Sequence, residues 1–398
     1  MRGARAKDDG TVTRAVTAGR KGEWTSRIVN PPVERASTHL YPDCATLRDH
    51  ATRNRDHEYF YGRRGSAAQW ALCDALTELE YGAAGTVLYP SGVAAIAGAL
   101  LAVLKAGDVL LMTDNVYDPS RSMAKGLLKR CGIQTRFFDP LDLASYEAAF
   151  CASTAAVLLE NPGSLTMEVC DIPALARIAR EKDAVSLIDN TWATSLGFPA
   201  LEHGCDITIQ SLTKHVGGHS DLLMGAATAS ANHYRALRLR AQQLGQVVSP
   251  DDAALALRGL RTMPLRLERS ARSALQIARW LRERNDVAQV LCPMLPGSPG
   301  HGLWSRDFGG GCGLFSFTLK GDDDARCRFV DSLRLFGIGY SWGGYESLAL
   351  PVDPVKHRSV MTTPADENTT VIRLSIGLED PADLISDLAC GFAAMELA

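Results

Sequence analysis

Short apolar runs alternate with longer segments of mixed polarity through the first half of the chain. Five of these runs have the length and the β-branched content of strands. They lie at residues 86–89, 109–112, 155–159, 184–188 and 207–209. Strands that alternate with loops and helices build a mostly parallel sheet with helices on its faces. We therefore predict an α/β fold through about residue 225.

Two segments carry the spacing of helices rather than strands. Residues 67–81 place Trp and Leu side chains at helical intervals, and residues 233–282 alternate basic and apolar positions. We expect the second segment to link the sheet to a smaller C-terminal domain. There, residues 314–319 alternate as a half-buried strand. The glycines at 309–313 precede a strand rather than a helix, so they are a flexible lead-in and no dinucleotide-binding fingerprint.

Composition and charge are typical of a soluble globular protein. The chain has 398 residues, of which 46% are hydrophobic and 22% charged, and its formal net charge is −3. A net charge so close to zero gives no field that would attract nucleic acid or a membrane. The ten cysteines form no C-x-x-C pair, which favours reduced thiols over a disulfide framework or a zinc site.

The N-terminal segment carries no recognisable targeting signal. Residues 1–9 are charged and lack the apolar run of a signal peptide. The longest apolar stretch, residues 93–104, is too short to span a bilayer. Residues 1–30 are rich in Arg, Lys, Gly and Thr without an apolar period, so we expect a mobile arm. These features predict a cytoplasmic protein.

The strongest candidate chemistry lies where two predicted strands end. Asp189 follows one apolar run, and Lys214 follows the next one after Ser211 and Thr213. Ligands of open α/β sheets sit beyond the carboxyl ends of the strands, so the acid and the amine would face one crevice. A lysine amine can bond to an aldehyde cofactor, commonly pyridoxal phosphate, and a carboxylate can keep the cofactor's pyridine nitrogen protonated. The alternative, a turn aspartate and a surface lysine, explains each residue singly but not their combination.

Two segments are candidates for holding a phosphate. Gly92 and Val93 follow a strand at the start of a helix, where free N–H groups and the helix dipole favour an anion, although an ordinary loop would look alike. Residues 57–65 crowd aromatic and arginine side chains together, including Tyr61 and Arg63. That segment is either a solvated basic loop or a source of bidentate arginine contacts to phosphate.

Further candidates are a tyrosine, an arginine and a group of histidines. Tyr117 follows a strand and could stack on a cofactor ring or fill the core. Arg373 lies within an apolar run and is either an edge residue or a clamp for an amino-acid carboxylate. A metal site is not predicted, because Gly217 and Gly218 interrupt any helix between two of the histidines. The histidines concerned are His203, His215 and His219.

Two of these motifs resemble one enzyme family. The D-N-T-x-A sequence at 189–193 and the S-x-T-K sequence at 211–214 resemble the cofactor-lysine region of the Cys/Met-metabolism pyridoxal-phosphate enzymes. The resemblance extends from about residue 30 to the C-terminus. It implies the type I pyridoxal-phosphate fold, which is aspartate aminotransferase-like, with pyridoxal 5'-phosphate as cofactor. It further implies an arm (1–65) contacting a neighbouring subunit, a large cofactor-binding domain (66–261) and a small α/β domain (262–398).

The resemblance also implies roles for the candidate residues. Lys214 would carry the cofactor and act as general base, Asp189 would face the ring nitrogen and Arg373 would bind the substrate carboxylate. Catalytic candidates are Lys214, Tyr117 and Tyr61. The other cofactor contacts would be Gly92, Val93, Ser211, Thr213, Tyr61 and Arg63, of which the last two come from the neighbouring subunit. The assembly would be a tetramer, a pair of dimers with shared active sites.

The C-terminal segment bears on the reaction. Many γ-eliminating or γ-replacing relatives carry a glutamate before S-L-G-G, whereas this chain has Tyr340, Ser341 and Trp342 there, as in the β-lyases of the family. We therefore expect these three residues to contact substrate in a C–S lyase that cleaves L-cystathionine by α,β-elimination. Residues 160–164 resemble the E-S-P-G-S form of the β-lyases, so no asparagine contact is carried over. The alternatives are a γ-lyase or C–S lyase acting on another amino acid, and a regulatory binding protein that keeps the cofactor.

Overall fold

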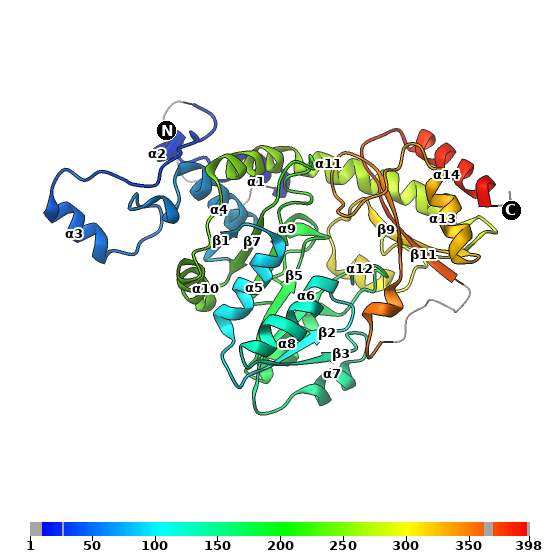
Figure 1. Cartoon of the computed structure of the whole chain (residues 1–398), viewed down its shortest axis with the longest axis horizontal. Coiled ribbons are helices and arrows are strands. Elements are labelled where there is room, and N and C mark those ends of the chain that lie inside the picture. The colour runs from blue at the N-terminus through cyan, green and yellow to red at the C-terminus, as the bar shows by residue number, and fades with distance from the viewer. Residues whose placement is uncertain (1–9, 26–27, 362–368, 396–398) are drawn as a thin grey trace.

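The computed structural model describes residues 10–25, 28–361 and 369–395. Within them, seven strands form a first sheet in the order β1-β7-β6-β5-β4-β2-β3, which lies at the centre of the molecule (Figure 1). The strands are β1 (Gly85–Tyr89), β2 (Val109–Thr113), β3 (Gln134–Phe138), β4 (Thr154–Glu160), β5 (Val185–Asp189), β6 (Ile207–Ser211) and β7 (Gly225–Ala229). Only β7 runs antiparallel to its neighbours among these described strands, so the prediction of a mostly parallel sheet is confirmed.

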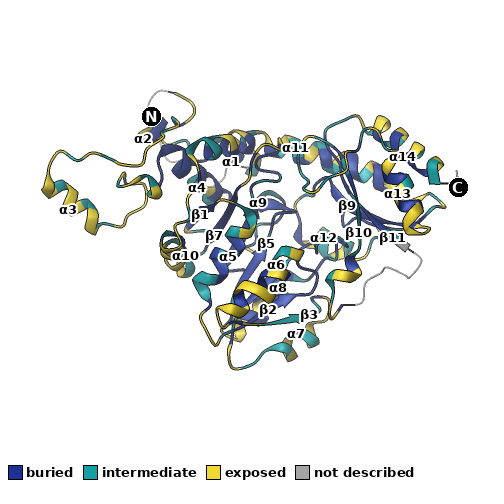
Figure 2. Cartoon of the chain, viewed as in Figure 1, coloured by how far each residue is buried: buried dark blue, intermediate teal, exposed yellow. Residues whose placement is uncertain are grey.

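Helices cover both faces of this sheet, which explains why its strands read as continuous apolar runs. One face packs against α4 (Ala67–Leu79) and α8 (Ile172–Glu181), and α1 (Thr11–Thr17) packs on α4. The other packs against α5 (Gly92–Val103), α6 (Asp118–Met123), η2 (Ala124–Leu128) and α10 (Ala231–Gln243). Two shorter helices, α7 (Leu143–Ala149) and α9 (Thr194–Gly197), occupy connections. Buried strands and outward-facing exposed helix surfaces are visible in Figure 2.

A second, antiparallel sheet lies in the C-terminal part. Its order in the described residues is β10-β11-β9-β8. The strands are β8 (Val287–Leu291), β9 (Leu314–Lys320), β10 (Leu348–Val352) and β11 (Thr369–Ser375). The accompanying helices are α12 (His301–Asp307), α13 (Asp323–Asp331), η3 (Pro354–His357) and α14 (Pro381–Met395). The strand predicted at residues 314–319 is therefore confirmed as β9, preceded by the glycines, but the prediction that it is half-buried is wrong, because every residue from 314 to 319 is buried.

The long helix α11 (Pro250–Arg282) runs beside both sheets (Figure 1). The prediction of one helical segment over residues 233–282 is wrong, because residues 244–249 separate α10 from α11. Gly245 adopts a positive φ of 69° after α10, and the hydroxyl of Ser249 accepts from the Asp251 N–H to begin α11 just before Pro250. The predicted domain boundary at 261/262 falls inside α11 and stays a prediction.

The N-terminal part has two regions of different character. The expectation of a mobile arm is wrong for residues 11–25, where α1 and α2 (Gly22–Thr25) bury Ala15, Ala18 and Trp24 against the body. These helices are too short for an apolar period to reveal them. Residues 1–9 lie outside the described residues. By contrast, the segment that carries α3 (Cys44–Thr52) extends away from the body (Figure 1), and none of the nine residues of α3 is buried.

Two general expectations concern membranes and thiols. In the described part of the chain, no helix is both long and apolar enough to cross a membrane. All ten cysteines lie in described segments and are free, four of them buried and four exposed.

Candidate active site

A cavity of about 230 Å³ opens at the carboxyl ends of β4, β5 and β6 and the start of α5. Its opposite wall comes from β11 and residues 340–342. Most of the predicted site residues line it together. They are Gly92, Val93, Tyr117, Asp189, Ser211, Thr213, Lys214, Tyr340, Ser341, Trp342 and Arg373. The structure therefore brings eleven candidates from distant parts of the sequence to one place.

Asp189 and Lys214 lie at the ends of neighbouring parallel strands. The Thr191 N–H donates to Asp189 Oδ1 at 3.0 Å, and the Thr191 hydroxyl donates to the same oxygen. Burial raises the pKa of Asp189, while the Thr191 donors and the Lys214 charge oppose that rise. A cation beside this carboxylate would stabilise its charged form. Asp189 is thus a suitable partner for a protonated ring nitrogen.

The amine of Lys214 is held toward the second wall of the cavity. Its Nζ donates to Ser341 Oγ at 2.7 Å and lies 5.4 Å from the centre of the Trp342 ring. Burial and the nearby Arg373 charge lower the pKa of Lys214 to about 8, against the opposing effect of Asp189. A lysine with this pKa has a substantial neutral fraction near pH 7–8, which nucleophilic and base chemistry require.

The start of α5 forms an anion cradle at one end of the cavity. Ser91 Oγ accepts from the Ala94 N–H at 3.1 Å, and the first N–H groups of a helix have no partner within it. Gly92 is required here, because a Cβ at this position would lie 2.8 Å from Ser211 Oγ. The Thr213 hydroxyl donates to the Met224 carbonyl at 3.2 Å and accepts from the Met224 N–H at 3.0 Å. Its contact with a phosphate therefore stays a prediction.

The turn after Lys214 is fixed by α11. Arg266 donates to the carbonyls of His215 and Gly259 at 2.8 and 2.6 Å. The helix also approaches this turn closely, since a Cβ at Gly259 would lie 2.2 Å from the Val216 carbonyl oxygen. The lysine therefore stands on a backbone that cannot shift without moving α11.

His215 is a packing residue in this arrangement. It is 3% exposed, and its ring lies 5.3 Å from that of Trp342 in an edge-on contact. Burial, with the Arg266 charge, lowers the pKa of His215 to about 3, so the ring is neutral. Among the described residues, no group of three His, Cys, Asp or Glu side chains could hold a metal ion.

The second wall of the cavity depends on Ser341. This residue has a φ of +86°, an unusual conformation for a residue other than glycine. In this conformation its hydroxyl accepts from Lys214 while its carbonyl accepts from Arg373 Nη2 at 3.0 Å. Burial lowers the pKa of Arg373, a guanidinium that remains charged at any physiological pH. Tyr340 is 88% exposed at the rim.

Glu160 is a cavity residue to which sequence reasoning assigned no role. Its Oε2 accepts from the Tyr117 N–H at 2.6 Å. Burial, followed by the neighbouring Asp189 charge, raises the pKa of Glu160 well above its ordinary value. The signal that could have identified it is the one that identified Asp189, a carboxyl group directly at the end of a buried strand.

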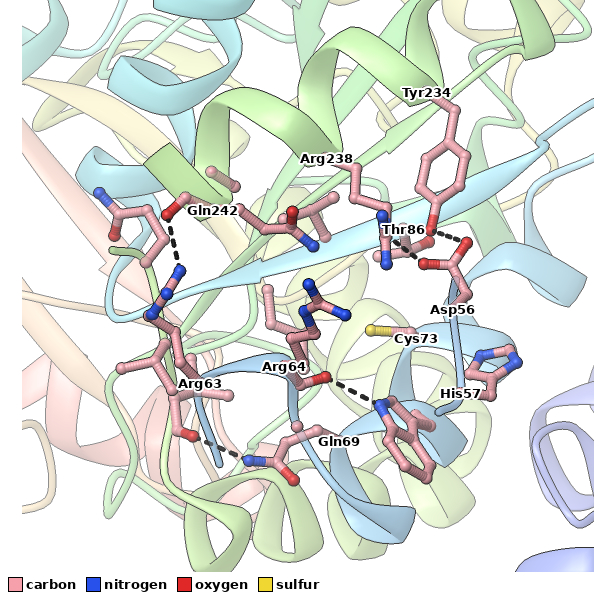
Figure 3. A pocket seen from close by; sticks show the side chains of 18 residues that line it. Asp56, His57, Arg63, Arg64, Gln69, Cys73, Thr86, Tyr234, Arg238 and Gln242 are labelled. Atoms are coloured by element: carbon pink, nitrogen blue, oxygen red, sulfur yellow. Dashed lines mark hydrogen bonds and ion pairs between the residues drawn. The ribbon is translucent and has the colours of Figure 1, made fainter. Parts of the chain in front are cut away.

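Tyr61 and Arg63 do not line this cavity. They lie on the loop around η1 (Gly62–Arg64), with Tyr61 46% exposed. Figure 3 shows Arg63 at a separate pocket of about 120 Å³, where its Nη1 donates to the Gln242 carbonyl at 3.1 Å. Arg64 stands in the same pocket with its guanidinium 4.0 Å from the Phe60 ring centre. The predicted contact of Tyr61 and Arg63 with a neighbouring subunit's cofactor stays a prediction.

The residues present fit the cofactor that the sequence resemblance implies. A partly buried amine, a carboxylate and a helix N-terminus where a Cβ on Gly92 would crowd Ser211 are brought together in one cavity. The aldehyde, ring nitrogen and phosphate of pyridoxal phosphate require these three kinds of group.

Comparisons with known proteins agree with this chemistry. Residues 12–393 match the family model described as Cys/Met metabolism PLP-dependent enzyme. The chain is 45% identical to cystathionine beta-lyase MetC of Escherichia coli (strain K12) over 388 residues, covering 96% of this chain and 98% of the relative. It is 43% identical to cystathionine beta-lyase of Salmonella typhimurium, covering 96% and 98%.

A solved structure is similar over nearly the whole chain. It is cystathionine gamma synthase from Xanthomonas oryzae pv. oryzae in complex with aminoacrylate and cysteine. The TM-score is 0.87 at 32% sequence identity, and the match covers 98% of this chain and 99% of the other.

Proposed function

The chain belongs to the family of Cys/Met metabolism PLP-dependent enzymes, and from that premise we propose that it cleaves L-cystathionine by α,β-elimination. The products are homocysteine, pyruvate and ammonia. The fold is the type I pyridoxal-phosphate architecture predicted from the sequence, and the cofactor is pyridoxal 5'-phosphate. The observation that carries the proposal is the partly buried Lys214 amine, placed between Asp189 on one wall and Ser341 on the other.

We assign the residues that hold the cofactor as follows. Lys214 would bind its aldehyde carbon and Asp189 would pair with its ring nitrogen, while the Gly92 and Val93 N–H groups and Ser211 would hold its phosphate. Tyr117, which lines the same cavity, would pack against the ring. When bound, the cofactor supplies an electron sink for negative charge that develops at the substrate Cα.

The protein's own groups position the substrate and move its protons. Arg373 binds the substrate α-carboxylate through two parallel N–H bonds, as guanidinium groups commonly do. The neutral Lys214 amine takes the Cα proton, and Ser341 Oγ keeps that amine on the correct side of the cavity. The bond between Cβ and sulfur then breaks, and the thiolate leaves as homocysteine after protonation. The remaining three-carbon fragment reacts with water to give pyruvate and ammonia.

The second wall supports β- rather than γ-elimination. A γ-elimination must also move protons at Cβ, which calls for a further acid–base group near that carbon. Beside Ser341 this chain places the exposed phenol of Tyr340 and the indole of Trp342, not a carboxylate. A γ-directed activity remains the second candidate, because the similar solved structure is a cystathionine gamma synthase.

We also propose a homotetramer, a pair of dimers, in which each arm completes the neighbouring site. The exposure of Tyr61 and the lack of any buried residue in α3 support it, since such segments gain stability by packing on a second copy. The domains proposed are 1–65, 66–261 and 262–398. A cytoplasmic location is supported by ten free cysteines, which a reducing compartment preserves.

The test is to incubate purified, cofactor-loaded protein with L-cystathionine and to identify the keto acid released. Pyruvate together with homocysteine is the expected result. Release of 2-oxobutyrate with cysteine would show that the enzyme cleaves at Cγ rather than Cβ. The assignments of the cofactor-binding residues would be unaffected. The absence of any product from a protein that binds the cofactor would turn the search to other amino acids, and then to a regulatory binding role.

A further inference from the structure

Two carboxyl groups, not one, stand at the strand ends that face the cavity. Glu160 at the end of β4 pairs in register with Asp189 at the end of β5, and both line the same space. In a parallel sheet, side chains at paired positions on adjacent strands lie on the same face. The mechanism above uses Asp189 and leaves Glu160 without a function.

The contacts of the two carboxyl groups differ. Asp189 accepts two hydrogen bonds from Thr191 and lies near the Lys214 charge, all of which favour its ionised form. Glu160 accepts one backbone hydrogen bond, from the Tyr117 N–H at 2.6 Å. Tyr117 precedes the first residue of α6, so this bond holds the backbone at the start of that helix, where the tyrosine lines the cavity.

The charges around Glu160 are mixed. Those that face it are the carboxylates of Asp189 and Glu168 and the guanidinium of Arg358. Arg358 is engaged elsewhere, since it donates to the Ser164 carbonyl at 2.7 Å and the Thr166 hydroxyl at 2.9 Å. Burial and the two carboxylates together outweigh the Tyr117 N–H and Arg358, which both favour the ionised form, and raise the pKa of Glu160. Two carboxylates at paired strand ends repel each other, so ionising both costs free energy. Where the surroundings raise the pKa of one group above that of the other, one stays protonated and the other carries the charge, and the two take different roles.

We propose that Glu160 is a positioning residue that works as a neutral acid. Its carboxyl group holds the Tyr117 backbone so that the ring covers the cavity, and it leaves Asp189 as the single carboxylate available to a cation there. The inference rests on the proposed function for the identity of that cation, the protonated ring nitrogen of the cofactor.

Two substitutions at one position separate the parts of this proposal. Glu160→Gln keeps an oxygen that can accept from the Tyr117 N–H and carries no charge, whereas Glu160→Leu removes the acceptor. Glu80→Gln is the matched control, because Glu80 is a buried carboxyl group that accepts from the Leu201 N–H at 2.9 Å but does not line the cavity. The measurements are the dissociation constant of pyridoxal phosphate and the circular dichroism of its absorbance band when bound.

Glu160→Gln should bind the cofactor within about twofold of the unmodified protein and give the same dichroism. Glu160→Leu should bind it roughly tenfold more weakly with altered dichroism, because the Tyr117 N–H has lost the acceptor that holds this backbone in place. The control should match the unmodified protein. Equal weakening by Gln and Leu would mean that the charged form is needed, and unchanged binding by Leu would remove the positioning role. Either result overturns the proposal.

A second readout needs no cofactor. A carboxyl group whose pKa is raised on folding binds a proton that the unfolded chain releases, so its contribution to stability falls as pH rises from the ordinary glutamate pKa toward the folded one. As pH increases over this window, the unfolding free energy of Glu160→Gln should therefore rise relative to that of the unmodified protein. If the difference between these two unfolding free energies does not change with pH, Glu160 is not a neutral acid in the folded protein. Failure of the unmodified protein to bind pyridoxal phosphate would instead refute the proposed function.

Discussion

The strand-end wall of the cavity and the arm that carries Tyr61 and Arg63 are held in different ways. Asp189 and Glu160 end strands that are buried beneath helices on both faces. The arm loop is exposed, and α3 buries none of its described residues. Groups that must stay within a fraction of an ångström come from the buried sheet, whereas the exposed arm would meet a second chain in the proposed assembly.

The largest effect should follow from removing the lysine of the rigid wall. Lys214→Ala eliminates both the covalent hold on the cofactor and the general base, so kcat should fall by roughly 10³-fold or more. The absorbance band of the lysine-bound cofactor should vanish with it. Retention of that band in Lys214→Ala would refute the assignment of the lysine.

An intermediate effect is expected from the wall formed by β11. Arg373→Lys keeps the charge but loses the planar pair of donors, so kcat/KM should fall by about 10²-fold, mainly through a higher KM. The cofactor should remain bound, as its absorbance will show. A fall in kcat alone would contradict the carboxylate role.

The smallest effect should come from a substitution in the arm, and mixing two variant chains should restore the lost cofactor binding. Arg63→Ala should weaken cofactor binding about tenfold, the cost of one charge-assisted hydrogen bond. After the Arg63→Ala and Lys214→Ala chains are mixed and reassembled, some sites should combine an intact lysine with an intact arginine from the partner. Cofactor binding of the original affinity would then reappear. If mixing restores nothing, Arg63 does not act across subunits.

The same contrast explains what the sequence could predict. Asp189 and Lys214 stood out because polar residues end apolar runs, and α4 because its apolar positions repeat at helical spacing. The strand β7 was missed as such, since Gly225–Ala229 consists of small residues with no strand pattern. Whether Tyr61 reaches a cofactor depends on a second chain, and no periodicity within one chain carries that information.

The close approach of α11 to the lysine turn has a consequence for how this chain can evolve. One inserted residue in α11 would rotate everything beyond it by about 100° and advance it about 1.5 Å. An insertion before Arg266 would carry its guanidinium away from the His215 carbonyl, and the second sheet would turn relative to the first. We therefore expect length differences among homologous chains to gather at residues 244–249 and 283–286, on either side of a helix whose residue count is fixed.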